Sequence, residues 1–485
     1  MKIALMILWI LSLVIAVGSI PASMLWFDIP EYFTLIFAVV IVIFAVGYIR
    51  IISKRGKRVA VTIISVVVIL ISAFGNYCNP YWNQGSRYSE TMNTVLTSKE
   101  AVEDLGCVMK HLKKCHPAFY HGIPEEVEVR YQEVLKQLGE TETVTVCWLS
   151  QKAEYICSVL RDGHTYVKEN PEVRHYMKDI YKFQKENAQL VAINGLDMKK
   201  LLEQTKDLYS YEAESWQLHM LKNDLSSAEG LMFLGIDTDA GVEYTYEHAD
   251  GTRESNTYHT ADFLTYEDYV SYNNIEQASD KEEPFVSFEI DEDKSLAILT
   301  LTSCNYNKEY KDCLLRMFRE VKEKNIQNVA VDLRDNGGGN SLVVNEFIRY
   351  LNVESFEQGT NDWRWGCFMI PFHQSTVKNK KYEELLFEGE VYVLTSSASF
   401  SSAMLFAQWM VDNDLGTLIG EAPGNDPNGY GDVTMFTLPN SKLFLQTSTK
   451  VFCRADKDNP DDLVEPDISC DANEAMEVLF EEISK

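Results

Sequence analysis

The chain has 485 residues, which is too many for one ordinary hydrophobic core, so two or three folded units are expected. Residues 1–76 hold six basic and two acidic residues, a net charge of +4, and because the whole chain carries −28, the remainder carries −32. A soluble part this acidic argues against nucleic acid as a partner, because binding phosphate groups requires a basic surface.

Three apolar blocks occupy the N-terminal region, and none of them contains a charged residue: Ile3–Ile20, Tyr32–Tyr48 and Val59–Phe74. Each is close to the ~17–25 residues that a helix needs to cross a bilayer, the last being the shortest. A signal peptide could account only for the first block, and buried core helices do not explain three blocks so close together. The sequence therefore predicts a membrane anchor of three transmembrane helices over residues 1–76.

The loop Arg50–Arg58 holds five basic residues and no acidic ones, so the positive-inside rule places it in the cytoplasm. The N-terminus is then also inside, and everything after about Asn76 lies outside the cell. This predicts a multi-pass protein of the cell membrane with an extracytoplasmic C-terminal part. Ten cysteines without a CxxC pair could form disulfides there, although buried thiols explain them equally well. The sequence shows no metal-ligand spacing, so we expect neither a metal nor another cofactor.

We predict that residues 77–165 form a polar linker followed by a helical cap domain. Apolar residues recur at helical spacing after Ser98, which is the expected N-cap. Residues 166–282 predict a small mixed module, in which a strand, an Asn-Gly turn and a helix precede a hairpin around Asp250–Gly251. Residues 283–485 alternate strands with helices, which is typical of a mostly α/β sheet.

Two loops follow buried strands of this last region. DLRDNGGGNS, Asp332–Ser341, places three glycines directly after a strand, where unobstructed amides suit a phosphate or an oxyanion. A tight turn without a ligand explains it about as well, and nucleotide binding lacks its usual glycine-lysine motif. The second loop, TSSASFSS, leads into an apolar helix, where a serine gains from the helix dipole. Serine is also a common helix cap, and no GxSxG elbow is present.

A third motif is LRDGHT, Leu160–Thr165. A serine nucleophile requires a base, and His164 could supply it, although a lone histidine in a turn is more often a solvated surface residue. His116, which precedes Pro117, is interpreted as structural.

In their order along residues 98–485, these motifs resemble the tail-specific, or C-terminal processing, serine peptidases. The resemblance is carried by DLRDNGGG, by the serine loop with the later Gly420–Glu421 pair, and by VEPDI near the C-terminus. LRDGHT and CHPAFYHG are similar to segments of the branch that includes the tricorn core protease and retinoid-binding-protein-like members. The resemblance implies a mixed α/β (α+β) catalytic domain over 283–485 and a PDZ-like or substrate role for 166–282.

The resemblance implies Ser401 as the nucleophile, because Gly420–Glu421 and the apolar residues Leu405–Ala407 then fall at the family's spacing. Ser399 would need a two-residue insertion and is the runner-up. The oxyanion hole is assigned to the amide of Ser402 and to a glycine amide, Gly337 or Gly338, with Gly338 preferred.

Where the serine–lysine members of the family have their lysine, this chain has Asp426, and residues 421–441 contain no lysine. Lys442 and Lys450 lie in strand-like stretches and are expected to face solvent. The departure implies the histidine-using branch, with His164 as general base. Gly163 stands where that branch has a serine, so this relay residue is missing or replaced.

The resemblance also offers Glu465, in VEPDI, as a supporting glutamate, and Asp162 could orient His164. The predicted function is a membrane-anchored serine endopeptidase that hydrolyses peptides or protein tails outside the cell. The alternative is a catalytically inactive relative that binds or senses peptides there.

Overall fold

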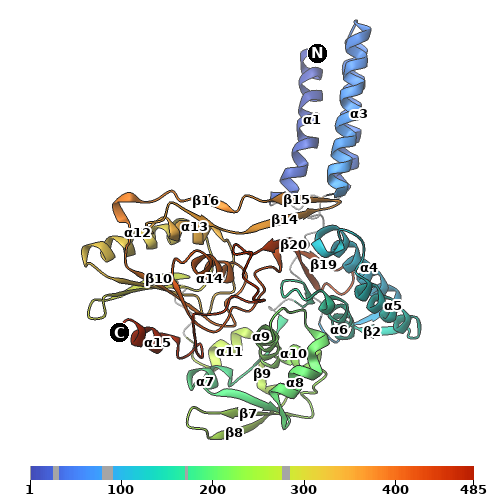
Figure 1. The fold of residues 1–485 in the computed structure, drawn as a ribbon. Coiled ribbons are helices and arrows are strands. Elements are labelled where there is room, and N and C mark those ends of the chain that lie inside the picture. The colour runs from blue at the N-terminus through green and yellow to red at the C-terminus, as the bar shows by residue number, and fades with distance from the viewer. Residues whose placement is uncertain (1, 26–31, 79–90, 170–172, 276–283) are drawn as a thin grey trace.

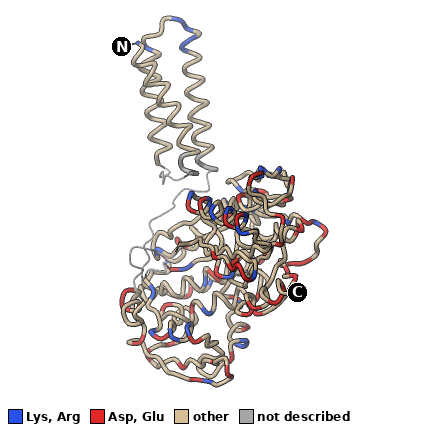
Figure 2. The backbone as a smooth tube through the Cα atoms, turned by 90° about the vertical axis from the view of Figure 1, so that its left-hand side faces the viewer, with Lys and Arg blue, Asp and Glu red and all other residues tan. Residues whose placement is uncertain are grey.

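A computed structural model describes residues 2–25, 32–78, 91–169, 173–275 and 284–485. Its first three helices, α1 (Lys2–Leu25), α2 (Phe33–Ile51) and α3 (Arg55–Cys78), are long and apolar enough to cross a membrane. They form a bundle that projects from the rest of the molecule (Figure 1). Basic residues gather at the end of the bundle that is farthest from the rest of the chain, close to the N-terminus (Figure 2).

A six-stranded sheet forms the centre of the C-terminal part, in the order β10-β11-β12-β17-β18-β21. Only β10 runs antiparallel to its neighbour, and the other pairings are parallel. The strands are β10 (Val286–Asp291), β11 (Leu296–Leu301), β12 (Asn328–Asp332), β17 (Glu390–Thr395), β18 (Thr417–Gly420) and β21 (Ile468–Ser469). This confirms the mixed α/β class.

Helices cover both faces of this sheet, as its hydrophobic clusters show. The helices on one face are α12 (Lys308–Glu323), α13 (Leu342–Ile348) and α14 (Ser402–Asp412). On the other face lies α15 (Ala475–Glu482). Loops at the carboxyl ends of β12 and β17 are the glycine and serine loops, so the parallel register brings these two motifs to the same edge.

A second sheet is antiparallel, in the order β15-β14-β20-β19, with β3 also paired to β20. Its strands are β3 (Tyr166–Lys168), β14 (Thr360–Trp365), β15 (Phe368–Phe372), β19 (Tyr430–Thr437) and β20 (Phe444–Cys453). A separate two-stranded antiparallel sheet pairs β13 (Ser355–Glu357) with β16 (Thr376–Lys378). The pairing of β3 with β20 ties the segment that follows the cap to the C-terminal part of the chain.

The helical cap begins at β1 (Val95–Thr97), and its elements are α4 (Ser98–Cys115), α5 (Glu125–Gly139), β2 (Thr143–Thr145) and α6 (Val146–Cys157). Helices occur where the sequence predicts them, but the first N-cap is Thr97 rather than Ser98. The Thr97 hydroxyl accepts from the Glu100 N–H, and the Glu100 carboxylate accepts from the Thr97 N–H, a complete capping box.

The mixed module packs below the cap in Figure 1. Its helices are α7 (Ile180–Lys185), α8 (Met198–Thr205), α9 (Glu214–Leu225), α10 (Ala228–Phe233) and α11 (Tyr266–Tyr272). Its strands are β4 (Tyr176–Met177), β5 (Gln189–Ile193), β6 (Leu196–Asp197), β7 (Val242–Glu247), β8 (Arg253–Tyr258) and β9 (Phe263–Leu264). The predicted Asn-Gly turn and the Asp250–Gly251 hairpin are both present.

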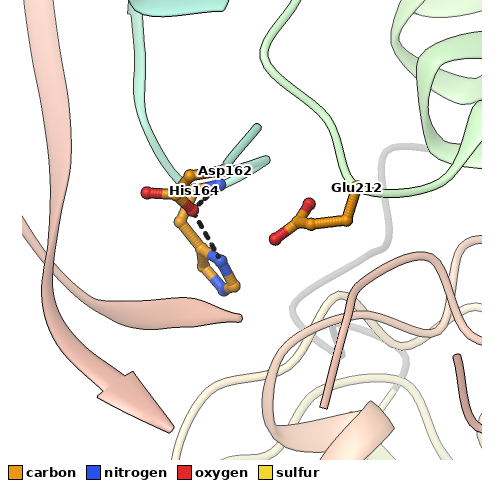
Figure 3. A group of neighbouring side chains, drawn as sticks. All are labelled: Asp162, His164 and Glu212. Carbon is orange, nitrogen blue, oxygen red and sulfur yellow. Dashed lines mark hydrogen bonds and ion pairs between the residues drawn. The ribbon is translucent and has the colours of Figure 1, made fainter. Parts of the chain in front are cut away.

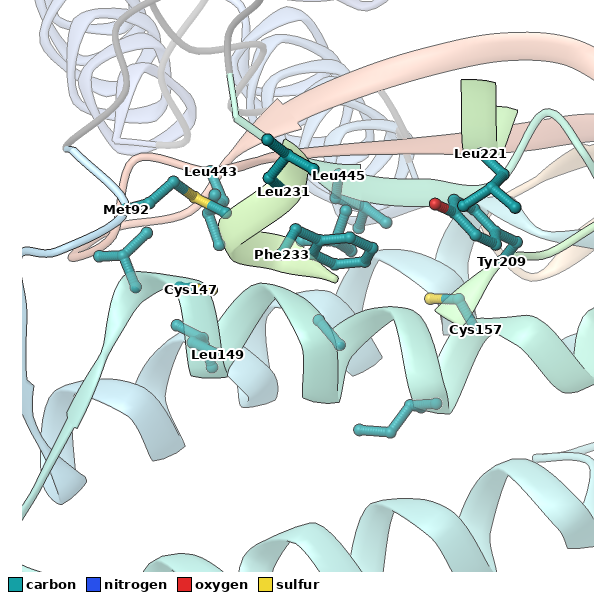
Figure 4. Packing of buried hydrophobic residues seen from close by; sticks show 14 of the residues in the cluster. Met92, Cys147, Leu149, Cys157, Tyr209, Leu221, Leu231, Phe233, Leu443 and Leu445 are labelled. Atoms are coloured by element: carbon teal, nitrogen blue, oxygen red, sulfur yellow. The ribbon is translucent and has the colours of Figure 1, made fainter. Parts of the chain in front are cut away.

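One hydrophobic core joins the cap, the module and the second sheet. Figure 4 shows Leu149 and Cys157 of the cap beside Phe233 of the module and Leu445 of β20. No disulfide joins any of the described cysteines, several of which are buried in this core. The proposed limits at 76, 165 and 282 remain predictions, and the shared core means that the three folded parts are closely packed.

Glu154 of α6 is a fully buried carboxyl, and we expect it to make stability depend on pH. It accepts a hydrogen bond from the Val167 N–H at 2.5 Å, and burial raises its pKa from 4.5 to about 8. Between these values the unfolded chain loses a proton that the folded protein keeps, so stability falls as pH rises, by roughly 4 kcal/mol.

Glu154→Gln should remove most of this dependence. Thermal unfolding of the full chain in detergent at about pH 5 and about pH 8 measures it. The exposed Glu126→Gln on α5 is the control and should keep the wild-type difference. An unchanged difference in Glu154→Gln would contradict the expectation.

Candidate active site

Ser401 stands at the junction between the serine loop and α14, in a backbone conformation that is strained for a residue with a Cβ. Its φ is 56° and its ψ is −118°. The buried Asn425 side chain accepts a hydrogen bond from the Ser401 N–H at 2.7 Å, which helps to hold this conformation. Backbone strain of this kind persists only where the surroundings enforce it, and it concentrates at active sites.

The neighbouring serines have structural partners. Ser399 is buried, and its hydroxyl donates to the Leu333 carbonyl at 2.7 Å and accepts from the Ser396 N–H at 3.0 Å. The Ser402 hydroxyl donates to the Gly339 carbonyl at 2.8 Å. The Ser401 hydroxyl makes no hydrogen bond to any described residue, and Ser401 lines a cavity. The geometry therefore favours Ser401 over the runner-up Ser399.

The glycine loop packs directly against Ser401. A Cβ on Gly338 would lie 2.7 Å from the Ser401 Cβ and 2.9 Å from the Ser402 nitrogen, and the φ of Gly338 is +101°. Both the close contacts and the positive φ exclude a side chain at position 338. The amide of Gly338, however, donates to Asn336 Oδ1 at 2.8 Å, so in this structure it is already engaged.

A cavity of about 420 Å³ opens beside Ser401. Gly339 and Ser402 line it, whereas Gly337 and Gly338 do not. Among the residues that the structure describes, no hydrogen bond uses the amide of Gly339 or of Ser402, the first residue of α14. These two amides are the ones that remain open to an oxyanion.

His164 lines the same cavity, although it belongs to a distant part of the chain. The β3–β20 pairing brings it there, and Gln446 Nε2 donates to the His164 carbonyl at 2.9 Å. Its ring packs on Phe400, the residue before Ser401, with centroids 4.5 Å apart. No described hydrogen bond joins the His164 ring to Ser401; such bonds often tighten only when substrate binds.

Asp162 lies behind His164 as a fully buried carboxylate. Its Oδ1 is 3.5 Å from His164 Nδ1 and accepts from the His164 N–H at 3.0 Å (Figure 3). Its Oδ2 is 3.1 Å from His116 Nε2 and accepts from the Thr165 hydroxyl at 2.5 Å. Burial opposes the charge, but these hydrogen bonds and the two histidines hold the pKa of Asp162 well below its usual range. Asp162 therefore remains an anion beside His164.

His116, which the sequence analysis interprets as structural, is the second histidine that contacts Asp162. His116 is buried, and its Nδ1 accepts from the Ala118 N–H at 3.1 Å. Nε2 must then carry the proton and donate it to Asp162. His116 thus fixes the carboxylate that faces His164, a function that the CHPAFYHG segment could have suggested.

Glu212 and Trp216, both from the mixed module, fill the space beside Gly163. A Cβ on Gly163 would lie 2.8 Å from Trp216 Nε1 and 2.9 Å from Glu212 Oε2. Glu212 Oε2 accepts from the Gly163 N–H at 2.9 Å, and Figure 3 shows its carboxyl extending toward the Asp162–His164 pair. Burial, with repulsion from Asp162, raises the pKa of Glu212 well above its usual range. A serine at 163 would require Trp216 or Glu212 to shift.

The ligand atoms of Asp162, His164 and Glu212 lie within 4.8 Å of one another, a spacing that could surround a metal ion. Hydrogen bonds already occupy most of this capacity, because three donors converge on Asp162 and one on Glu212. The same arrangement suits proton transfer by His164. The spacing of these three side chains is therefore no evidence for a metal ion.

The remaining sequence candidates divide between the cavity and the surface. Asp426, at the lysine position of the family, lines the cavity, and burial raises the pKa of its carboxyl. Lys450 also lines the cavity, contrary to the expectation of a solvent-facing residue, and pairs with Asp432 at 2.6 Å. Lys442 lies outside it, and Glu465 is exposed before β21 and does not line the cavity. The structure does not bring Glu465 to the site.

Residues 295–470 match the model of peptidase family S41. This range contains Gly338 and Ser401 and leaves out His164. No curated protein sequence matches the chain. Among solved structures, mature CPAF aligns with a TM-score of 0.54 at 13% identity, over 80% of this chain and 96% of its own. That likeness shows a shared fold.

Two further solved structures align more loosely. The photosystem II D1 C-terminal processing protease has a TM-score of 0.45 at 12% identity, over 80% of this chain and 98% of its own. The tricorn protease has a TM-score of 0.31 at 13% identity, over 80% of this chain and 37% of its own.

Proposed function

The chain belongs to peptidase family S41 and is a serine-type peptidase, and from this premise we propose that it is a membrane-anchored endopeptidase whose catalytic part lies outside the cytoplasm. Its substrates are peptides or protein tails, cleaved through an acyl-enzyme on Ser401. The observation that carries the assignment is the strained Ser401, placed at a helix N-terminus in the same cavity as His164.

In the proposed mechanism, Ser401 Oγ attacks the peptide carbonyl carbon while His164 accepts the hydroxyl proton. Because His164 Nδ1 faces Asp162, its Nε2 is the nitrogen available to Ser401. Collapse of the tetrahedral intermediate breaks the C–N bond, and His164 returns the proton to the leaving amine. Water, deprotonated by His164, then hydrolyses the ester and restores Ser401.

Charge that develops on the carbonyl oxygen requires hydrogen-bond donors in place before the reaction. The amides of Gly339 and Ser402 are our candidates, because both residues line the cavity and neither amide is engaged among the described residues. Asp162 acts as a positioning residue, because its carboxylate faces the His164 ring and accepts a hydrogen bond from the His164 N–H. His116 in turn fixes the Asp162 carboxylate.

The placement in the membrane rests on α1, α2 and α3, which are apolar and long enough to span a bilayer. The basic turn Arg50–Arg58 and the N-terminus lie at the end of the bundle away from the catalytic part (Figure 2). The positive-inside rule assigns that end to the cytoplasm, which leaves the peptidase outside.

A fluorophosphonate probe, which forms an adduct with activated serines, tests the nucleophile in the full chain in detergent. Labelling is expected in the wild type and should be lost in Ser401→Ala, because Ser401 shares its cavity with His164 and its hydroxyl has no hydrogen bond among the described residues. Ser397→Ala, in the same loop, should keep it, and so should Ser399→Ala where that variant folds, since the Ser399 hydroxyl is buried and bonded.

A folded wild-type protein that takes no label would reject the peptidase mechanism and favour an inactive peptide-binding relative. Labelling that persists in Ser401→Ala and disappears in Ser399→Ala would reject the choice of serine.

A further inference from the structure

The hairpin of β14 and β15 carries an uncharged apolar segment on one edge of the second sheet. From Gly366 to Phe372 the sequence is GCFMIPF, in a chain of which 24% is charged. β15 is an edge strand, and Phe368 and Phe372 are 41% and 50% exposed. An exposed edge strand without charges can pair with another chain and aggregate in water, so soluble proteins usually protect such edges.

Apolar side chains also continue onto β14. The register pairs Trp365 with Phe368 and Trp363 with Ile370, so these four side chains share one face of the hairpin. The opposite face is turned to the cap, where Arg364 donates to the Lys113 carbonyl at 3.1 Å. Within this apolar set, Phe368 and Phe372 on the edge strand are exposed, and Trp363, Trp365 and Ile370 are half-buried.

The position of the hairpin indicates what covers it. The apolar stretch of α3 that could cross a membrane ends at Gly75, and the Phe74 ring lies edge-on to the Phe368 ring with centroids 6.0 Å apart. Figure 1 shows β14 and β15 directly below the ends of α1 and α3. The hairpin is thus level with the point where α3 leaves the hydrocarbon layer.

We propose that Gly366–Phe372, together with Trp363 and Trp365, lies in the interfacial layer of the bilayer, so that the partner of this surface is lipid. Aromatic rings are enriched at that depth because they are apolar yet tolerate water at one end. Pro371 has no N–H to offer another strand, which makes β15 a poor template for a second copy or for a substrate peptide. The inference rests on the proposed membrane span of α3.

This contact would fix the catalytic cavity close to the lipid surface. Asn361 lines the cavity and lies four residues before Trp365 on β14, a distance of about 14 Å along the strand. The substrates that this position favours are segments near a membrane surface.

Three single-cysteine labels on the full chain test the proposal. The exposed Cys367 and Cys453 are first replaced by serine, and this parent protein measures background labelling from the remaining cysteines. A fluorophore is then attached to Phe372→Cys, to Leu70→Cys on α3, or to Val433→Cys on β19. The protein is placed in phosphatidylcholine–phosphatidylglycerol vesicles whose phosphatidylcholine carries a nitroxide quencher near the headgroup.

Val433 is the matched control, because it is 40% exposed on the opposite edge strand of the same sheet. Quenching at position 372 should be at least about threefold stronger than at 433, because interfacial residues lie ~5–10 Å into the headgroup boundary. Phe368→Asp should reduce quenching at 372 toward the level at 433.

The label at Leu70, which is 62% exposed on α3, separates the two proposals. Strong quenching at 70 with none at 372 would overturn the lipid contact and leave the membrane span intact. Absence of quenching at 70 would reject the membrane span itself. A disulfide-linked dimer through Phe372→Cys, without quenching there, would assign the edge to a second copy and also overturn the proposal.

Discussion

His164→Ala is expected to lower kcat/KM for a peptide substrate by roughly 10⁴–10⁶-fold, because a serine without its general base is a poor nucleophile. His164 is the histidine that lines the cavity beside Ser401. The residual activity should come from binding and the oxyanion donors alone. The loss should appear mainly in kcat, because the histidine acts on the transition state more than on the bound substrate.

Lys450→Ala provides the comparison for His164→Ala, because Lys450 lines the same cavity and is the lysine that could act as general base in place of His164. Lys450 Nζ pairs with Asp432 at 2.6 Å and is therefore already engaged by a carboxylate. Lys450→Ala should therefore lower kcat/KM by less than about tenfold, and Lys442→Ala, outside the cavity, should have no effect beyond about twofold. An essential Lys450 with a dispensable His164 would place the chain among the serine–lysine members of the family.

Asp162→Asn is expected to lower kcat by roughly 10²–10⁴-fold, with little change in KM. The carboxylate faces His164 Nδ1 at 3.5 Å and also accepts from the His164 N–H, so it sets both the ring orientation and the tautomer. An asparagine of the same size can present an N–H to Nδ1, which favours the wrong tautomer, and it removes the negative charge that stabilises the imidazolium.

Asp426→Asn makes the same chemical change in another carboxyl of the cavity, one that has no hydrogen bond or ion pair to Ser401 or His164 among the described residues. It should lower kcat by less than about tenfold. A steady-state comparison of both variants, with their unfolding temperatures measured alongside, separates loss of positioning from loss of fold. Equal losses in the two variants would contradict a specific role for Asp162.

The order of elements follows from local patterns, and so does the choice of Ser401 and His164 as candidates, which the structure places in one cavity. Strand, loop and helix around Ser401 follow from hydrophobic runs and turn residues, and the histidine motif lies in a short recognisable segment. The three long apolar helices follow from composition alone. What brings His164 to Ser401, the pairing of β3 with β20, has no local signal in either strand.

The features of the site that the sequence does not reveal depend on tertiary contacts. Gly338 has the right place and conformation for the oxyanion hole, but its amide is taken by Asn336, which sequence spacing cannot show. Asn425, which holds the Ser401 amide, carries no motif of its own. Glu465 belongs to a matching segment, yet the loop before β21 keeps it at the surface. The hairpin of β14 and β15 is not predicted from the sequence, because the uninterrupted apolar run of β15 shows no alternation with polar residues.

The contact of Gly163 with Trp216 links the segment before His164 to the mixed module. A side chain at 163 would collide with Trp216 and Glu212, and a smaller residue at 216 would remove the ring that stacks on Phe400 at 3.8 Å. A serine at 163 therefore requires Trp216 or Glu212 to move, and movement of Trp216 changes the packing on Phe400, the residue before Ser401. Gly163 is thus coupled, through one tryptophan ring, to the packing beside the candidate nucleophile.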